Sequence, residues 1–256
     1  MTEAAIQPSS NRDLILPEQT VGLSGHYDHD DISVPVCTLV QPTSKDKGEA
    51  GWYWFPDGSQ YEELMTVVLH IAATRSLFAD IDSGEGLICR SNDRVMGYTE
   101  KPNLVFNDEA ETGTRYIQCQ ECPHFEDNQF ERGVLCKKGY TLLLYETERR
   151  FPFLFFVRGT AVGIVKKRIV SPALARLQDT GTASPWLWKY QWLPKLRQDN
   201  FKYYVPDIYK KDEVDEEEQA RYQMMAAQLR GATQQVGIED EAVVSGVSSA
   251  PFQEPA

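Results

Sequence analysis

Residues 186–205 read WLWKYQWLPKLRQDNFKYYV, and this stretch indicates a pair of strands. Large aromatic residues alternate with other residues over 186–193, which is the period of two that places alternate side chains on one face of a strand. Residues 201–205 predict the second strand, and the link 194–200 between the two is basic at its start and polar at its end. The pattern therefore predicts two strands, the first with a row of aromatic rings on one face.

Further strands are predicted outward from this pair, because β-branched and aromatic residues gather in short runs that Pro, Asp and Gly separate. The runs cover Val34–Gln41, Gly51–Phe55, Leu64–Ala73, Tyr140–Tyr145 and Phe153–Val157. A short amphipathic helix is expected over Thr160–Val170, ended or kinked by Ser171-Pro172, and an acidic helix from Asp212 to Leu229. The fold class predicted is therefore mainly β (α+β).

The composition favours a soluble globular protein: 41% of the 256 residues are hydrophobic and 25% are charged. We expect a flexible arm over 1–31, a main domain over 32–211, an acidic helix over 212–230 and a disordered acidic tail over 231–256. No apolar run approaches the roughly 20 residues that a membrane span needs. The first residues lack the basic start and apolar stretch of a secretory signal, so we expect a cytoplasmic location.

Four of the five cysteines lie in the polar segment 89–136, where few core residues are expected and a metal commonly stabilises the fold instead. The sequence CQEC at 119–122 is a Cys-x2-Cys knuckle, which presents two thiolates to one ion. Four thiolates satisfy the tetrahedral shell of a structural zinc site, with His124 as a substitute ligand. The alternative is a set of unrelated buried thiols. The expected Zn²⁺ ligands are Cys89, Cys119, Cys122 and Cys136.

The remaining cysteine and two other groupings are expected to be structural. Cys37 lies in an apolar strand and is assigned to the core. The pair His26 and His29 lies in an acidic stretch and is interpreted as a solvated loop. The aromatic cluster 52–55 lies in the acidic half of the chain and is interpreted as structural.

Residues 137–211 contain 15 Lys and Arg against 5 Asp and Glu, although the net charge of the whole chain is −12. Such a segment can supply a local positive field for a polyanion. Aromatic rings in the same segment can stack on unpaired bases, at about 1–3 kcal/mol per base, while cations follow the phosphates. The alternative is that the aromatic face packs into the core and the cations are only solvated. The expected nucleic-acid contacts are Arg158, Lys166, Lys167, Arg168, Trp186, Trp188, Lys189, Tyr190, Trp192, Lys195, Arg197, Lys202 and Tyr203.

The motifs of common catalytic sites are missing from the sequence. There is no phosphate-binding loop of the G-x-x-x-x-G-K-[ST] type, no H-E-x-x-H and no G-x-S-x-G. The Cys-x2-Cys knuckle also lacks the H-x-E partner of the zinc deaminases. We therefore expect a binding protein and not an enzyme.

A series of short motifs resembles a known family. The motifs are Ala50–Tyr53, Cys89–Asp93, Cys119–Pro123, Cys136, Pro152–Phe155 and Tyr203–Pro206, followed by the acidic helix and tail. Over residues 34–210 the chain is similar to single-stranded-DNA-binding proteins of tailed bacteriophages. The resemblance implies an OB-fold-like β-barrel, zinc held in the insertion 89–136, a role in phage DNA replication or recombination, and action in the host cytoplasm.

Two functions from different classes follow. The first is sequence-tolerant binding of single-stranded DNA, with the acidic tail competing for the basic groove and recruiting replication or recombination proteins. The second is a zinc-stabilised protein-interaction module, such as a phage regulator of host transcription or of the replication machinery, that uses the acidic surface of residues 1–136. Steeply salt-dependent DNA binding would favour the first function.

Overall fold

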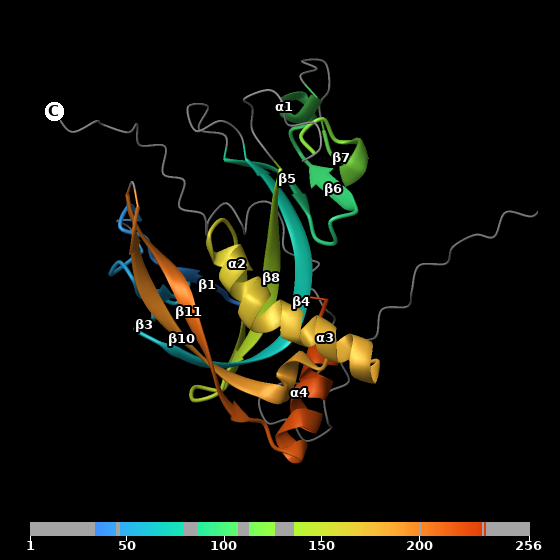
Figure 1. The fold of residues 1–256 in the computed structure, drawn as a ribbon. Coiled ribbons are helices and arrows are strands. Elements are labelled where there is room, and N and C mark those ends of the chain that lie inside the picture. The colour runs from blue at the N-terminus through green and yellow to red at the C-terminus, as the bar shows by residue number, and fades with distance from the viewer. Residues whose placement is uncertain are drawn as a thin grey trace, which may run out of the picture.

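This computed structural model describes residues 34–44, 47–78, 86–106, 113–125, 136–199, 201–231 and 233. It is mainly β, with one large mixed sheet and few helices, as the sequence predicts (Figure 1). The expected arm, its two histidines and nearly all of the expected tail lie outside the described residues. Among the helices that are described, none combines the length and apolar character needed to cross a membrane.

Most of the helical elements lie between the strands β9 and β10. The strands are β1 (Val36–Leu39), β2 (Tyr53–Trp54), β3 (Gln60–Tyr61), β4 (Leu64–Phe78), β5 (Leu87–Ser91), β6 (Met96–Thr99), β7 (Arg115–Gln118), β8 (Lys137–Glu146), β9 (Phe151–Val157), β10 (Trp188–Gln198) and β11 (Lys202–Glu213). The helical elements are α1 (Pro102–Phe106), the 3₁₀ turn η3 (Cys119–Glu121), α2 (Ala161–Val165), the π turn η5 (Lys166–Val170), α3 (Ser171–Thr180), the 3₁₀ turn η6 (Pro185–Leu187) and α4 (Glu216–Leu229).

The long strand β4 organises the sheet. Its first residues pair with β10, most of its length pairs with β8, and its last residues pair with β5, all antiparallel. A register shift between Val68 and His70 marks a bulge, which increases the local bend and twist of a strand. Figure 1 shows β4 curving through the molecule, from the β10–β11 hairpin at one end to β5 and β6 at the other.

The sheet continues from β8 to β9 and then, in parallel, to β1. The end of β1 approaches β11 through Gln41. The Gln41 side chain donates from Nε2 to the Tyr204 carbonyl at 3.1 Å and accepts from the Tyr204 amide at Oε1 at 2.9 Å. One side-chain amide thereby supplies both hydrogen bonds of a ladder step between two strands that do not otherwise pair.

Within the described part of the chain, the buried side chains form three groups. The first lies between β1, β4, β8, β9, β10, β11 and the helical segment at 161–170, and includes Phe55, Phe153, Trp192 and Ile208. The second lies between α4 and the strands β4, β8 and β9. The third belongs to the segment inserted between β4 and β8 and includes Ile88 and Val105. The insertion was expected to have few core residues, but it has a small core of its own.

Several predicted boundaries need correction. Ser171-Pro172 does not end the helix: α2 passes into the π turn η5, where the Ser171 amide donates to the Lys166 carbonyl, and the chain continues as α3 with Pro172 in its first turn. A π turn and a proline are both sites at which helices kink. The expected link 194–200 is largely strand, since β10 runs to Gln198. The acidic helix begins later, at Glu216, and Asp215 caps it by accepting from the Glu218 amide at 2.8 Å.

Other assignments are confirmed. Cys37 is 1% exposed and belongs to the core as predicted. In the cluster 52–55, Tyr53 and Phe55 are 0% and 2% exposed, whereas Trp52 and Trp54 are half-buried. The strands predicted over 140–145 and 153–157 lie within β8 and β9.

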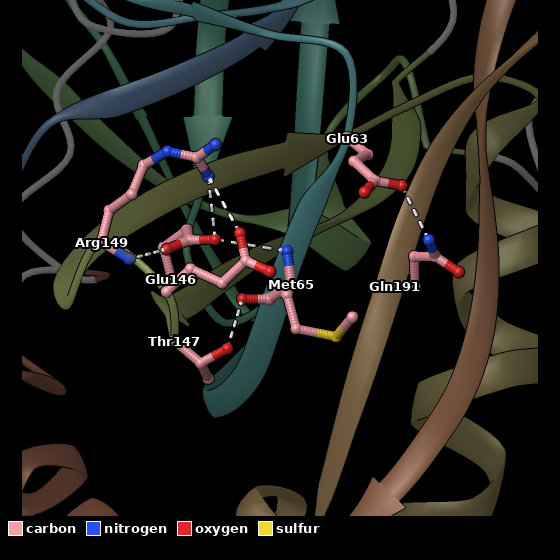
Figure 2. A network of polar contacts seen from close by, with 7 residues as sticks. Glu63, Met65, Glu146, Thr147, Arg149 and Gln191 are labelled. Carbon is pink, nitrogen blue, oxygen red and sulfur yellow. Dashed lines mark hydrogen bonds and ion pairs between the residues drawn. The ribbon is translucent and has the colours of Figure 1, made fainter.

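A buried carboxylate fixes the turn between β8 and β9 (Figure 2). Glu146 is fully buried, and its Oε1 accepts from the Met65 amide at 3.3 Å and from Arg149 Nη1 at 3.1 Å. Its Oε2 accepts from the Arg149 amide at 2.5 Å. The turn is therefore joined to the start of β4, while Gln191 of β10 donates to Glu63 nearby at 2.7 Å.

Candidate functional site

The knuckle at 119–122 is a single 3₁₀ turn at the end of β7. The Cys122 amide donates to the Cys119 carbonyl at 3.2 Å, which closes the turn. The Cys119 amide donates to the Val95 carbonyl at 2.7 Å, which joins the turn to the residue before β6. Cys119 and Cys122 are each 5% exposed, so both thiols are held inside the insertion.

The two remaining thiols reach the same place from distant parts of the chain. Cys89 lies on β5, and Cys136, just before β8, donates its amide to the His124 carbonyl at 3.3 Å. All four predicted cysteines line one enclosed cavity of about 10 Å³, together with Arg75 and Ile117 among others. That volume is close to the smallest that accepts one water-sized sphere.

The pKa values of two of these thiols reflect their burial and the nearby sulfurs. Burial first, and then the three other cysteines of the cavity, together raise the pKa of Cys89 to about 12. Burial also raises the pKa of Cys136 to about 11, although Arg75 opposes this change. Without a positive ion in the cavity, both groups are therefore neutral thiols at pH 7.

The four sulfurs are suitable ligands for a metal ion, but their present positions are too far apart to hold one. Four cysteine sulfurs form the softest donor set that a protein offers, which suits a thiophilic divalent ion such as Zn²⁺. Within the described residues, however, no three Cys, His, Asp or Glu side chains already converge closely enough to hold an ion. Binding would therefore have to draw the thiols inward. His124 is directed elsewhere, since its Nε2 lies 3.0 Å from the Val105 carbonyl oxygen.

A groove of about 900 Å³ lies where the end of β1, the end of β9 and the start of α2 meet the tip of the β10–β11 hairpin. Its lining includes five aromatic residues and two cationic residues. The aromatic residues are Phe155, Phe156, Phe201, Tyr203 and Tyr204, and the cationic residues are Arg158 and Lys202.

The hairpin tip carries the most accessible rings of this groove. Phe201 is 68% exposed, and its ring centroid lies 5.7 Å from that of Tyr203 at an interplanar angle of 51°. The Tyr203 hydroxyl donates to Asp199 at 2.8 Å, which fixes its ring across the hairpin. An aromatic surface of this kind offers π faces to a planar ligand.

Arg158 lies at the other side of the groove, held between rings. Its guanidinium carbon is 5.1 Å from the Phe78 ring centroid and 5.7 Å from that of Phe156. Lys202 is exposed at the hairpin tip. Three of the predicted contact residues, Arg158, Lys202 and Tyr203, therefore line one groove.

The aromatic row over 186–192 does not form a stacking platform. Tyr190 and Trp192 are 5% and 0% exposed and belong to the first core, so their prediction as base-stacking residues is wrong. Trp186 lies in η6 and not on the strand, and it packs beside the second core. Trp188 is half-buried, with the Lys210 ammonium 2.9 Å from its ring centroid. The alternative interpretation, a face that packs into the core, holds for this row.

The predicted cations are distributed over several surfaces. Lys166, Lys167 and Arg168 are exposed on η5. Arg197 is exposed on β10 opposite Tyr203 in the ladder with β11, so it lies beside the groove.

Two other predicted cations are paired with carboxylates. Lys195 lies 3.2 Å from Asp207, and Lys189 lies 2.8 Å from Glu218 of α4. Because Lys189 is already paired with Glu218 of α4, it is the less suited of the two to bind a phosphate.

Some groove residues are not in the predicted contact set. Phe201 and Tyr204 flank the predicted pair Lys202 and Tyr203 in sequence, and their aromatic character was a sufficient signal. Phe156 shares a face of β9 with Leu154 and packs beside the second core, so no local pattern in the sequence places it at the groove.

Comparisons with known proteins returned no match for this chain, whether against models of protein families, curated proteins or solved structures. Function is therefore inferred from the residues and their geometry.

Proposed function

We propose that this protein binds single-stranded nucleic acid, DNA in the first instance, without strong sequence preference and without catalysing a reaction. The observation that carries the proposal is the 900 Å³ groove, whose lining includes the exposed Phe201, the adjacent Tyr203, and the cationic residues Arg158 and Lys202. Rings that stack on bases and cations that attract phosphates are the two components that such binding requires. Arg197, beside the hairpin tip, extends the positive surface.

The strand connections support an OB-like barrel as the scaffold. In chain order β4, β8 and β9 are followed by a helical segment and by the hairpin β10–β11, and β4 pairs with both β8 and β10. An OB-fold has this connectivity in five strands and binds oligonucleotides beside the loops after its first and fourth strands. Here the loop after the first strand is the cysteine-bearing insertion, and the loop after the fourth is the hairpin tip at the groove. Strand β1 is an addition between β9 and β11.

We propose Zn²⁺ as a structural ion of the insertion, held by Cys89, Cys119, Cys122 and Cys136. The shared cavity and the all-sulfur donor set support this choice. When bound, zinc would deprotonate the thiols and cross-link β5, η3 and the start of β8. It would stabilise the insertion that follows β4.

The proposed binding is tested by removing a ring from the groove. Phe201→Ala should weaken binding of oligo-dT about 5- to 150-fold, because one stacked base contributes about 1–3 kcal/mol. Tyr209→Ala is the matched control: Tyr209 is also an exposed ring on β11, at 42%, but it does not line the groove. Fluorescence anisotropy of a labelled oligonucleotide measures both affinities. Equal affinities of the two variants and the wild type would contradict the groove as the binding site.

A second candidate is a protein-interaction module. It is favoured by an exposed apolar set on the insertion, since Val95 and Tyr116 are 62% and 66% exposed and Met96 is 41% exposed. Such a patch is typical of docking surfaces. A chain that binds no oligonucleotide, and whose binding to a protein is lost in Tyr116→Ala, would favour this function over the first. Proteins of replication or recombination are the partners proposed for the acidic C-terminal residues under the first function.

A further inference from the structure

Arg75 is a buried cation beside the four thiols. It lies on β4, is 4% exposed and lines the cysteine cavity. In the ladder with β5, Arg75 is opposite Ser91 and Leu77 is opposite Cys89. Residues two apart on a strand share a face, so Arg75 and Cys89 project from the same side of the sheet.

Arg75 contacts the two chain segments that carry the other ligands. It donates a hydrogen bond to the Cys136 side chain. Its guanidinium carbon lies 4.3 Å from the Phe125 ring centroid, and the Phe125 amide donates to the Cys122 carbonyl at 3.0 Å. Arg75 thereby connects β4 to the segment that follows the knuckle and to the residue just before β8.

The charge of the proposed site explains why a cation is placed there. One Zn²⁺ with four thiolates carries a net charge of −2, and an uncompensated charge in a buried site is costly. We propose that Arg75 is the buried counter-charge of a four-thiolate metal site and a positioning residue for its ligand Cys136. This inference rests on the proposed zinc site and not on the proposed binding of DNA. The ion it favours is a thiophilic divalent cation.

Arg90 provides a matched control on the neighbouring strand. It is 3% exposed, as buried as Arg75, and it also borders the cavity, but it follows Cys89 directly, so its side chain projects from the opposite face of β5. Its Nη2 donates to the Thr141 hydroxyl at 3.0 Å, and its guanidinium lies 5.0 Å from the Phe156 ring centroid. Its charge is directed to the barrel strands β8 and β9.

The test compares zinc retention in the full chain and its variants Arg75→Met and Arg90→Met. Each removes one buried charge and keeps most of the side-chain length. Zinc per chain is counted first, and transfer of zinc to a chromogenic chelator then gives the affinity. We expect wild type to hold one zinc, Arg75→Met to bind it about 10- to 100-fold more weakly, and Arg90→Met to stay within about threefold of wild type.

Three outcomes overturn the inference. If Arg75→Met binds zinc within about threefold of wild type, the charge of Arg75 does not stabilise the site. If both variants lose the same affinity, the effect of Arg75→Met is only a general destabilisation of the fold. A wild-type chain that holds no zinc overturns the metal site itself, and this inference with it, whereas loss of DNA binding alone leaves both intact.

Should Arg75→Met not fold, Arg75→Lys decides the question, because it keeps the charge but not the planar donor. An affinity for zinc close to wild type supports the proposal. A loss as large as that of Cys136→Ser overturns it.

Discussion

Gln41 and Tyr204 are joined by two hydrogen bonds, 3.1 and 2.9 Å long, between one side-chain amide and one residue's backbone. The two residues are far apart in sequence, and their bridge connects the end of β1 to the edge of β11. Both residues also line the groove. The bridge therefore holds two walls of the proposed binding site at a fixed separation.

Removing this bridge should reduce both stability and binding. Gln41→Ala should lower the free energy of unfolding by about 1–3 kcal/mol, because the Tyr204 amide and carbonyl lose their partner. It should also weaken binding of oligo-dT. Urea unfolding and anisotropy measure the two effects.

Gln191→Ala is the control, since it removes a glutamine whose hydrogen bond to Glu63 is exposed. It should change stability by less than about 0.5 kcal/mol. If the two variants behave alike, the bridge has no special role.

The buried carboxylate of Glu146 should be essential for the β8–β9 turn. Glu146→Ala leaves the Met65 and Arg149 amides and the Arg149 guanidinium without their acceptor. We expect a loss of about 3–5 kcal/mol in the free energy of unfolding, which chemical denaturation measures. Glu148→Ala, in the same turn but with its side chain 64% exposed, should cost less than about 0.5 kcal/mol. A small effect at Glu146 would contradict its assignment as an anchor.

Zinc content should depend on the cysteines of the insertion and not on the fifth. We expect Cys119→Ser to lose the metal and to destabilise the insertion, because serine does not replace a thiolate on zinc. Cys37→Ser removes a thiol that is as buried but lies in the first core. Elemental analysis should find zinc retained in Cys37→Ser and lost in Cys119→Ser. Retention in both would show that Cys119 is not a ligand.

The acidic residues at the C-terminus should compete with DNA for the groove. A deletion that tests this competition must leave α4 in place. Tyr222 of α4 is 1% exposed and its ring lies 5.4 Å from that of Tyr145, so a deletion from 212 would remove core residues. The chain should instead be cut after Thr233. The shortened chain should bind oligo-dT more tightly at low salt, and salt should reduce the difference. Unchanged affinity at low salt would dispose of the competition.

The sequence predicts those features of the fold that depend on short-range patterns of residues. The runs over 140–145 and 153–157 predict strands because their side chains suit a buried sheet, and the cysteine spacing predicts that four cysteines gather in one part of the fold, where they line one cavity. The alternation over 186–192 predicts that rings share a face but not whether that face meets water. Here Trp192 fills the core, and Pro185 begins a 3₁₀ turn that takes Trp186 off the strand.

The groove could not be predicted in full because its walls come from segments that meet only in the folded chain. The parallel pairing of β1 with β9 and the Gln41 bridge depend on contacts between distant residues, which no local pattern encodes. Arg75 is hidden for the same reason: a single arginine inside an apolar strand pattern gives no sign that a cysteine cluster will pack against it.

The most direct test of the proposed function is an anisotropy titration of the full chain with oligo-dT and with a duplex of equal length, at low and moderate salt. We predict tight binding of the single strand, much weaker binding of the duplex, and an affinity that falls as salt rises. Equal binding of both forms would indicate a purely electrostatic contact and contradict base stacking in the groove. No binding to either would contradict the account and favour the protein-interaction module.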